Sequence, residues 1–294
     1  MTKFIEAVRQ DNGLWTVTTV ETTVEKDVVC TIKDEIVPPP VAIPPTNSVL
    51  FHDDFSSMDV KKSMNGISWG SPNAGSGDKL PVVTNDCPFN GKPSLKFTFG
   101  GGPPDDDAWC EQRIKLGAGL GEFWVQFYLY RPSGTEEKFI GPKWVHRDAP
   151  GGDNNKIMVW WGGDYGKYTI TCGLSAWEDN TGHDVMYTTL GTNQLDGSGQ
   201  RGTPSAPAEP ESNLGRWVKM TFHAKTASIA NNDGIVQFLE DDVIKIDNRA
   251  LPLYPRDGIG NLFTDGYLMG WMNTGFENTT HCYIADFKLS DKPL

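Results

Sequence analysis

Four side chains between residues 113 and 146 carry groups that could take part in chemistry: Arg113, Gln126, Tyr128 and His146. A guanidinium is a fixed cation, an amide donates and accepts hydrogen bonds, and a histidine or a tyrosine can transfer a proton. Simpler interpretations compete. Arg113 lies two residues from Glu111 on one face of an expected strand, so we favour a surface ion pair over catalysis for it. His146 lies in a Lys, His, Arg cluster that is typical of a solvated edge.

Residues 122–130 carry a second pattern, which favours binding to sugars. Apolar and polar or aromatic residues alternate there with the two-residue period of a strand. One face holds Phe123, Val125, Phe127 and Leu129. Aromatic rings stack on sugar rings and amides bond to hydroxyls, so we predict a carbohydrate-binding groove formed by the other face and its neighbours, namely Trp124, Gln126, Tyr128, Tyr130, Trp144, His146 and Arg147. Core packing is the alternative for some tryptophans, including Trp144, Trp160 and Trp161.

Other kinds of chemistry lack a local signature. The five cysteines are odd in number and show no CxxC spacing, and no GxSxG is present. The acidic triplet at 105–107 lacks the alternating ligands of a calcium loop, so we interpret it as a solvated turn. We therefore expect no bound metal and no cofactor.

The elements that must position these residues are strands. Residues 215–251 predict three consecutive strands, separated by an Asn-Asn-Asp-Gly turn at 231–234 and an acidic corner at 240–242. The 32 glycines and 20 prolines supply many turns, and no segment has sustained helical periodicity. An all-β fold follows, in which most cysteines are expected to be reduced and buried.

Three regions are expected. Residues 1–37 are β-rich but too short to enclose their apolar side chains, so they predict an attachment or oligomerisation arm. Residues 38–48 are a proline-rich linker that is extended and semi-rigid. Residues 49–294 form the main domain, because a large β-sandwich commonly reaches this size as one unit.

The strand pattern at 215–251 resembles the concanavalin A-like lectin and glucanase (LamG-like) jelly rolls, of the kind found in bacteriophage virion proteins and in jelly-roll polysaccharide lyases. The runs at 51–57 and 283–290 look like the opening and closing strands of such domains. This resemblance implies a two-sheet antiparallel jelly-roll sandwich, with the short N-terminal β-rich arm attached, whose first and last strands lie near each other. The ExDxE of the glucanases is absent, which argues against that hydrolytic route.

The resemblance to the lyases rests on Glu-Gln-Arg at 111–113, which looks like their arginine strand. In those enzymes Arg, Gln or Asn neutralises a uronate carboxylate and a His or Tyr takes the C5 proton, so the resemblance implies a site formed by Arg113, Gln126, Tyr128 and His146. Their Q-[IV]-H and Y-F-K-A-G motifs are absent here.

The net charge and the apolar runs of the chain bear on its partners and its location. The net charge of −12 argues against a nucleic-acid partner, and no apolar run predicts a secretory signal or a membrane span.

We interpret the chain as a bacteriophage virion structural protein, a capsid decoration, fibre or tail component made in the host cytoplasm. It would display a glycan-binding head and contact other virion proteins through residues 1–37, as a homo-oligomer with a trimer favoured. We favour a protein without enzymatic activity; the alternative is a polysaccharide lyase or other depolymerase acting on an acidic surface polysaccharide.

Overall fold

The computed structural model describes residues 2–9, 15–22, 49–60, 68–103, 107–137, 139–145, 155–164, 167–178, 184–191, 200–201, 213–228, 231, 233–251, 253 and 262–294. The chain divides into two units, Met1–Thr46 and Asn47–Leu294. Strands dominate both, and the described residues contain no α-helix. The all-β prediction is therefore confirmed. Since no helix occurs there, no helix in the described ranges is long and apolar enough to cross a membrane.

The N-terminal unit is a strand pair. β1 (Thr2–Arg9) pairs antiparallel with β2 (Trp15–Thr22), with Thr2 opposite Thr22 and Arg9 opposite Trp15. Residues 23–37 and the proline-rich linker at 38–48 lie outside the described residues. The role of residues 1–37 in attachment or self-association stays a prediction.

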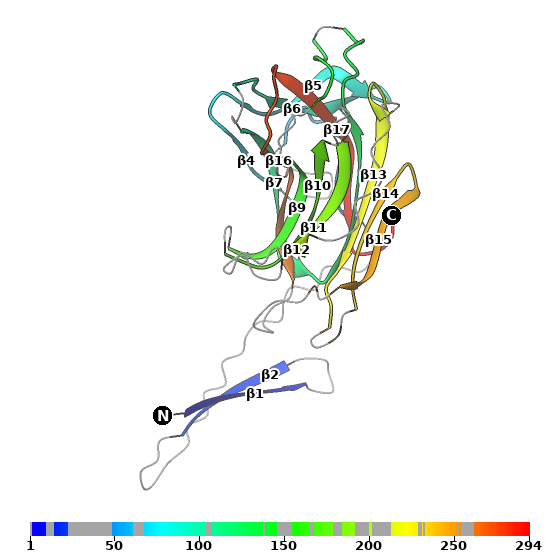
Figure 1. Ribbon diagram of the computed structural model, residues 1–294. Helices are drawn as coiled ribbons and strands as arrows, with labels where there is room; N and C mark the ends of the chain where they lie inside the picture. Colours follow the sequence, from blue (N-terminus) through cyan, green and yellow to red (C-terminus); the bar gives the residue numbers. More distant parts are fainter. Residues whose placement is uncertain are drawn as a thin grey trace. The chain divides into compact units, whose positions relative to one another are not determined.

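The larger unit contains two antiparallel sheets that lie face to face (Figure 1). The seven-stranded sheet has the order β12 (Gln200–Arg201), β11 (Asp184–Gly191), β10 (Lys167–Glu178), β9 (Asn155–Asp164), β16 (Phe263–Met272), β7 (Ala108–Leu120) and β4 (Trp69–Ala74). The eight-stranded sheet has the order β15 (Val243–Leu251), β14 (Gly234–Glu240), β13 (Trp217–Lys225), β8 (Glu122–Tyr130), β17 (Thr280–Ser290), β6 (Lys92–Phe99) and β5 (Lys79–Phe89), and β3 (Val49–Asp53) also pairs with β17. This is the predicted two-sheet jelly-roll sandwich.

The three strands predicted within 215–251 are β13, β14 and β15, which pair in that order. Asp241 and Asp242 form the tight acidic corner between the last two, with φ of 46° and 66°. Two successive positive φ angles match the right-handed twist of a hairpin. The corner was therefore placed correctly from the sequence.

One face of each sheet builds the core. Phe123, Val125, Phe127 and Leu129 of β8 are buried there, as their alternation predicted. The ring of Phe123 lies 5.0 Å from that of Trp160, which comes from β9 of the other sheet. The face of each sheet that points away from this core is called its outer face below.

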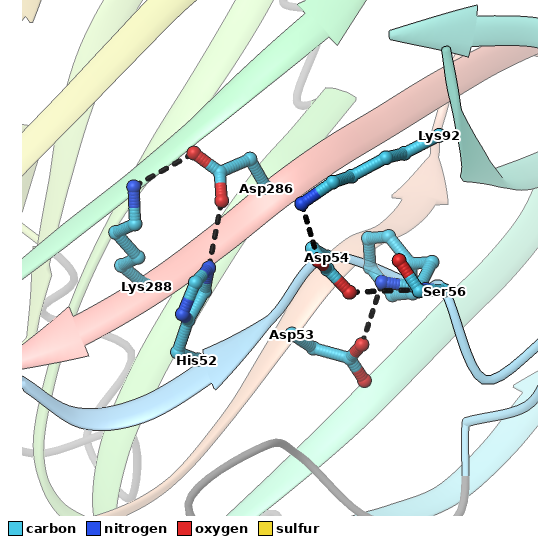
Figure 2. A network of polar contacts seen from close by, with 8 residues as sticks. His52, Asp53, Asp54, Ser56, Lys92, Asp286 and Lys288 are labelled. Atoms are coloured by element: carbon cyan, nitrogen blue, oxygen red, sulfur yellow. Dashed lines mark hydrogen bonds and ion pairs between the residues drawn. The ribbon is translucent and has the colours of Figure 1, made fainter. Parts of the chain in front are cut away.

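The first and last strands of the larger unit lie side by side, as expected from the resemblance. β3 pairs with β17, placing Phe51 opposite Leu289. Figure 2 shows the polar contacts next to this pairing, where His52 Nε2 lies 2.7 Å from Asp286 Oδ1. Lys92 Nζ lies 2.6 Å from Asp54 Oδ2, so β6 is tied to the segment that follows β3.

Candidate functional site

The outer face of the seven-stranded sheet carries a buried ion pair on β7. Cys110 and Ile114 point into the core, so Glu111 and Arg113 point to the outer face. Arg113 Nε donates a hydrogen bond of 2.5 Å to Glu111 Oε1. The Glu111 side chain is 1% exposed and that of Arg113 is 26% exposed. The ion pair that the sequence favoured for Arg113 is therefore present, and one side of its guanidinium is held by a carboxylate.

The neighbouring strands shape the space around Arg113. A Cβ on Gly70 of β4 would lie 2.9 Å from Arg113 Cβ, so glycine there allows the two strands to approach. On the other side, β16 places Tyr267 directly opposite Arg113. Directly paired residues of antiparallel strands share a face, so the phenol and the guanidinium lie on the same surface.

Tyr267 is held in position by its surroundings. Its ring lies 5.6 Å from that of Trp161 on β9, and both residues are buried. Gly270 has φ of 135°, and a Cβ there would lie 2.6 Å from the Tyr267 ring. Only glycine adopts this backbone conformation readily. Glycine at position 270 therefore leaves the room that the Tyr267 ring occupies on the outer face.

An aromatic pair lies farther along the same face. Trp109 of β7 is paired with Trp271 of β16, and their rings are parallel to within 7° with centroids 5.6 Å apart. Trp271 is 41% exposed. Trp109 Nε1 donates a 2.9 Å hydrogen bond to Glu111 Oε2, so one carboxylate holds both the indole and Arg113.

Lys156 of β9 lies over this aromatic pair. Its Nζ is 5.9 Å from the centroid of the Trp271 ring and donates a 2.6 Å hydrogen bond to Asn273 Oδ1. Burial lowers the pKa of Lys156 to about 8, and the charge of Asp107 acts in the opposite direction. The ammonium form therefore dominates below pH 8, and the neutral amine above it.

The residues predicted for carbohydrate binding lie on the other sheet. Trp124 stacks on His223 with ring centroids 4.1 Å apart, and Tyr128 stacks on Phe89 at 4.1 Å. Gln126 is buried, and Tyr130 OH donates a 3.1 Å hydrogen bond to Glu136 Oε1.

Two further residues predicted for this groove, His146 and Arg147, lie outside the described residues. Trp144 lies in the core, where its ring packs against Phe99 at 5.8 Å and Phe276 at 4.8 Å. Its indole faces protein rings, so the structure places it in the core packing that the sequence left open as an alternative.

The predicted site that combined Arg113 with Gln126, Tyr128 and His146 was wrong, because the structure does not bring Arg113 together with Gln126 and Tyr128. β7 and β8 follow each other with Gly121 between them, but they belong to different sheets. Arg113 is therefore on the outer face of the seven-stranded sheet, whereas Gln126 and Tyr128 point away from the core on the opposite side of the sandwich. His146 is outside the described residues.

The outer face of the eight-stranded sheet has a small pocket of its own. Its volume is about 110 Å³, and it is lined by Asp54, Phe89, Asn90, Lys92, Pro93, Ala285 and Asp286. Figure 2 shows Lys92 reaching Asp54, and both residues line this pocket. Among the described residues, no group of three or more His, Cys, Asp or Glu side chains could hold a metal ion.

Sequence reasoning missed Lys156, Tyr267, Trp109 and Trp271. Two signals could have found the three aromatic residues among them. Trp109, Glu111 and Arg113 have the two-residue spacing of one strand face, and Tyr267 and Trp271 flank the glycine at 270. No strand was predicted at 263–272, although β16 supplies half of the site.

Comparison with known proteins finds solved structures with a similar fold. The sequence matches no protein-family model and no curated protein. Among solved structures, the alginate lyase Aly36B in complex with an alginate trisaccharide has a TM-score of 0.53 at 12% identity, covering 76% of this chain and 95% of that chain. An endo-β-1,4-glucuronan lyase from the fungus Trichoderma reesei also has a TM-score of 0.53, at 14% identity, covering 82% of this chain and 95% of that chain.

The chain has the concanavalin A-like jelly-roll fold. This confirms the resemblance drawn from the strand pattern. The interpretation as a bacteriophage virion structural protein was wrong, because the two solved structures named above are polysaccharide lyases, which agree with the alternative. At this level of identity the likeness concerns the jelly roll itself, so the activity must be argued from the residues of the site.

Proposed function

We propose that this jelly-roll protein is a polysaccharide lyase that cleaves an acidic polysaccharide by β-elimination at a uronate unit. The observation that carries the proposal is the cross-strand pair of Arg113 and Tyr267 on the outer face of the seven-stranded sheet. It brings a fixed cation and an ionisable hydroxyl to one surface. The structural neighbours that cleave alginate and glucuronan support the same class of substrate.

The reaction requires a charge to be neutralised and a proton to be moved. Arg113 pairs with the uronate carboxylate, which makes the C5 proton more acidic and stabilises the negative charge that develops on the carboxylate oxygens. Removal of that proton lets the C5 electron pair form a double bond to C4. The C4–O4 bond then breaks and O4 leaves with a proton. Water is not added, so the product carries an unsaturated uronate.

Each residue has one role in this scheme. Arg113 is 26% exposed while Glu111 holds its Nε, so the guanidinium is oriented and reachable from solvent. Tyr267 is the proton-transfer residue that we assign, because it is the direct cross-strand partner of Arg113. Glu111 is a positioning residue that acts through Arg113.

The test is an assay for the unsaturated product with alginate, glucuronan and a neutral glucan. We expect ultraviolet absorbance to rise with a polyuronate and to stay flat with the neutral glucan. Tyr267→Phe should lower kcat by about 100-fold or more if the hydroxyl transfers the proton, with an unchanged melting temperature. Tyr130→Phe removes a hydroxyl from the opposite sheet and is the matched control. Absence of unsaturated product from every polyuronate, or equal activity of both variants, would overturn the proposal.

The outer face of the eight-stranded sheet supports a second candidate, a glycan-binding surface separate from the site of cleavage. The stacked Phe89 and Tyr128 rings lie beside the pocket of about 110 Å³ lined by Asp54 and Asp286. An aromatic wall next to carboxylates suits a sugar ring with hydroxyl groups. Tyr128→Ala should weaken binding to the polysaccharide without lowering kcat on short oligosaccharides. Unchanged retention in affinity electrophoresis would contradict this role.

A further inference from the structure

We propose that Trp109, Trp271 and Lys156 form a subsite that binds an anionic sugar unit of the polysaccharide, separate from the unit held by Arg113. The inference rests on the proposed function for the nature of the ligand. Its physical basis is independent of catalysis and consists of an exposed aromatic platform and an ammonium group above it that has no ion-pair contact with a carboxylate of the described residues.

The platform is rigid and accessible. The two indoles are parallel to within 7°, and Trp109 is anchored through its Nε1 to the buried Glu111. Trp271 remains 41% exposed although it is stacked, so part of its ring faces solvent. The C–H groups on one face of a pyranose ring pack well against such a surface. A fixed exposed indole pair is therefore suited to hold a sugar ring without rearrangement.

Among the described residues, the ammonium above the platform has no ion-pair contact, although the nearby charge of Asp107 raises the pKa of Lys156. Lys156 Nζ lies 5.9 Å from the Trp271 ring centroid, and its hydrogen-bond partner is the neutral amide of Asn273. Within the described part of the chain, no carboxylate lies within ion-pair distance of this ammonium.

Other half-buried lysines differ in this respect, since Lys96, Lys219 and Lys288 each pair with an aspartate. A partly buried ammonium without an anion costs free energy, and the carboxylate of a bound sugar would offset that cost.

The position along the sheet assigns the subsite to a different sugar unit. Trp109 and Arg113 lie four residues apart on β7, which is about 13 Å along a strand. Although both side chains meet at the Glu111 carboxylate, the exposed ring of the platform is that of Trp271 on the neighbouring strand, so the platform extends the surface away from Arg113. The subsite would hold a unit to one side of the cleaved bond, and Lys156 would make the enzyme prefer a uronate over a neutral sugar at that unit.

The experiment measures binding separately from cleavage. The intact chain with Tyr267→Phe is titrated calorimetrically with an alginate oligosaccharide and with a neutral gluco-oligosaccharide at pH 7. In that background, Lys156→Met should weaken binding of the oligouronate about 5-fold to 10-fold and leave binding of the neutral sugar unchanged. Trp271→Ala should weaken both. Lys115→Gln is the matched control. It removes an exposed positive charge from β7, the strand that carries Trp109, without changing a residue of the platform.

The pH dependence gives a second readout. Because burial lowers the pKa of Lys156 to about 8, oligouronate binding should weaken as the pH rises from 7 to 9, and this dependence should disappear in Lys156→Met. The inference is overturned if Lys156→Met binds the oligouronate as tightly as its parent, if Lys115→Gln causes the same loss, or if no oligouronate binds. Formation of the unsaturated product tests the proposed function separately. If the chain makes no such product but Lys156→Met still weakens oligouronate binding, the subsite is supported and the lyase function is not.

Discussion

Replacing Arg113 with methionine should destabilise the fold strongly, because it leaves the carboxylate of Glu111 buried without its cation. The Glu111 side chain is 1% exposed, and its remaining hydrogen bond comes from Trp109 Nε1. Removal of one partner of a buried pair costs ~3 to 5 kcal/mol. Since the Arg113 side chain is 26% exposed, we expect the lower end, about 3 kcal/mol, which changes the folding equilibrium by roughly a hundredfold.

The double variant Glu111→Gln/Arg113→Met separates this cause from simple loss of packing. It removes both charges, so its free energy of unfolding should return to within about 1 kcal/mol of the parent. Urea denaturation of the parent, the single variant and the double variant measures these differences. Arg216→Met is the control, because the pair of Arg216 with Asp241 is 42% and 44% exposed and should contribute less than about 1 kcal/mol.

Two outcomes would refute the reasoning. One is a cost of less than about 1 kcal/mol for Arg113→Met, which would mean that water reaches Glu111. The other is a double variant as unstable as the single one, which would mean that Arg113 contributes by packing. If the double variant is stable, it also serves the enzyme assay, since loss of product formation there cannot be attributed to unfolding.

Three further changes should have measurable effects. Burial lowers the pKa of Lys156 from 10.5 to about 8, so the unfolded chain binds more protons between these values; the free energy of unfolding should rise with pH in this window, less so in Lys156→Met. Gly270→Ala should cost about 1 to 3 kcal/mol and reduce activity, because φ is 135° and the new Cβ would lie 2.6 Å from the Tyr267 ring. Trp69→Phe removes the 2.6 Å hydrogen bond to Asp53 and should cost about 1 to 3 kcal/mol. Because burial already raises the pKa of Asp53, urea denaturation should show a larger cost at pH 7 than at pH 5.

The strands and their core faces were readable from the sequence because the signals are local. The alternation over residues 122–130 assigned Phe123 and Val125 to the core correctly, and the acidic turn placed the hairpin of β14 and β15. Both patterns depend on the two-residue period and on turn chemistry, which act over a few residues.

The site was harder to predict, because a strand pattern does not say which sheet the strand joins. β7 and β8 look like neighbouring strands in the sequence, yet the chain changes sheets at Gly121. As a result, the alternative lyase site predicted from the sequence combined Arg113 with Tyr128, whereas the structure places them on opposite sides of the core. The partner that Arg113 does have, Tyr267, is 154 residues away in the chain, and only the pairing of β16 with β7 brings them together.

The buried pair of Glu111 and Arg113 is difficult to explain by stability alone. Desolvating two charges costs several kcal/mol per ion, and a well-packed apolar pair of similar volume would often be as stable or more so. Here the same carboxylate also receives the indole N–H of Trp109, so it holds the guanidinium and one ring of the aromatic platform in fixed positions. In the proposed lyase, this carboxylate would hold the cation and the platform on one face, where a charged polymer would be aligned across several units. Its role in orientation would account for a buried pair that stability alone does not explain.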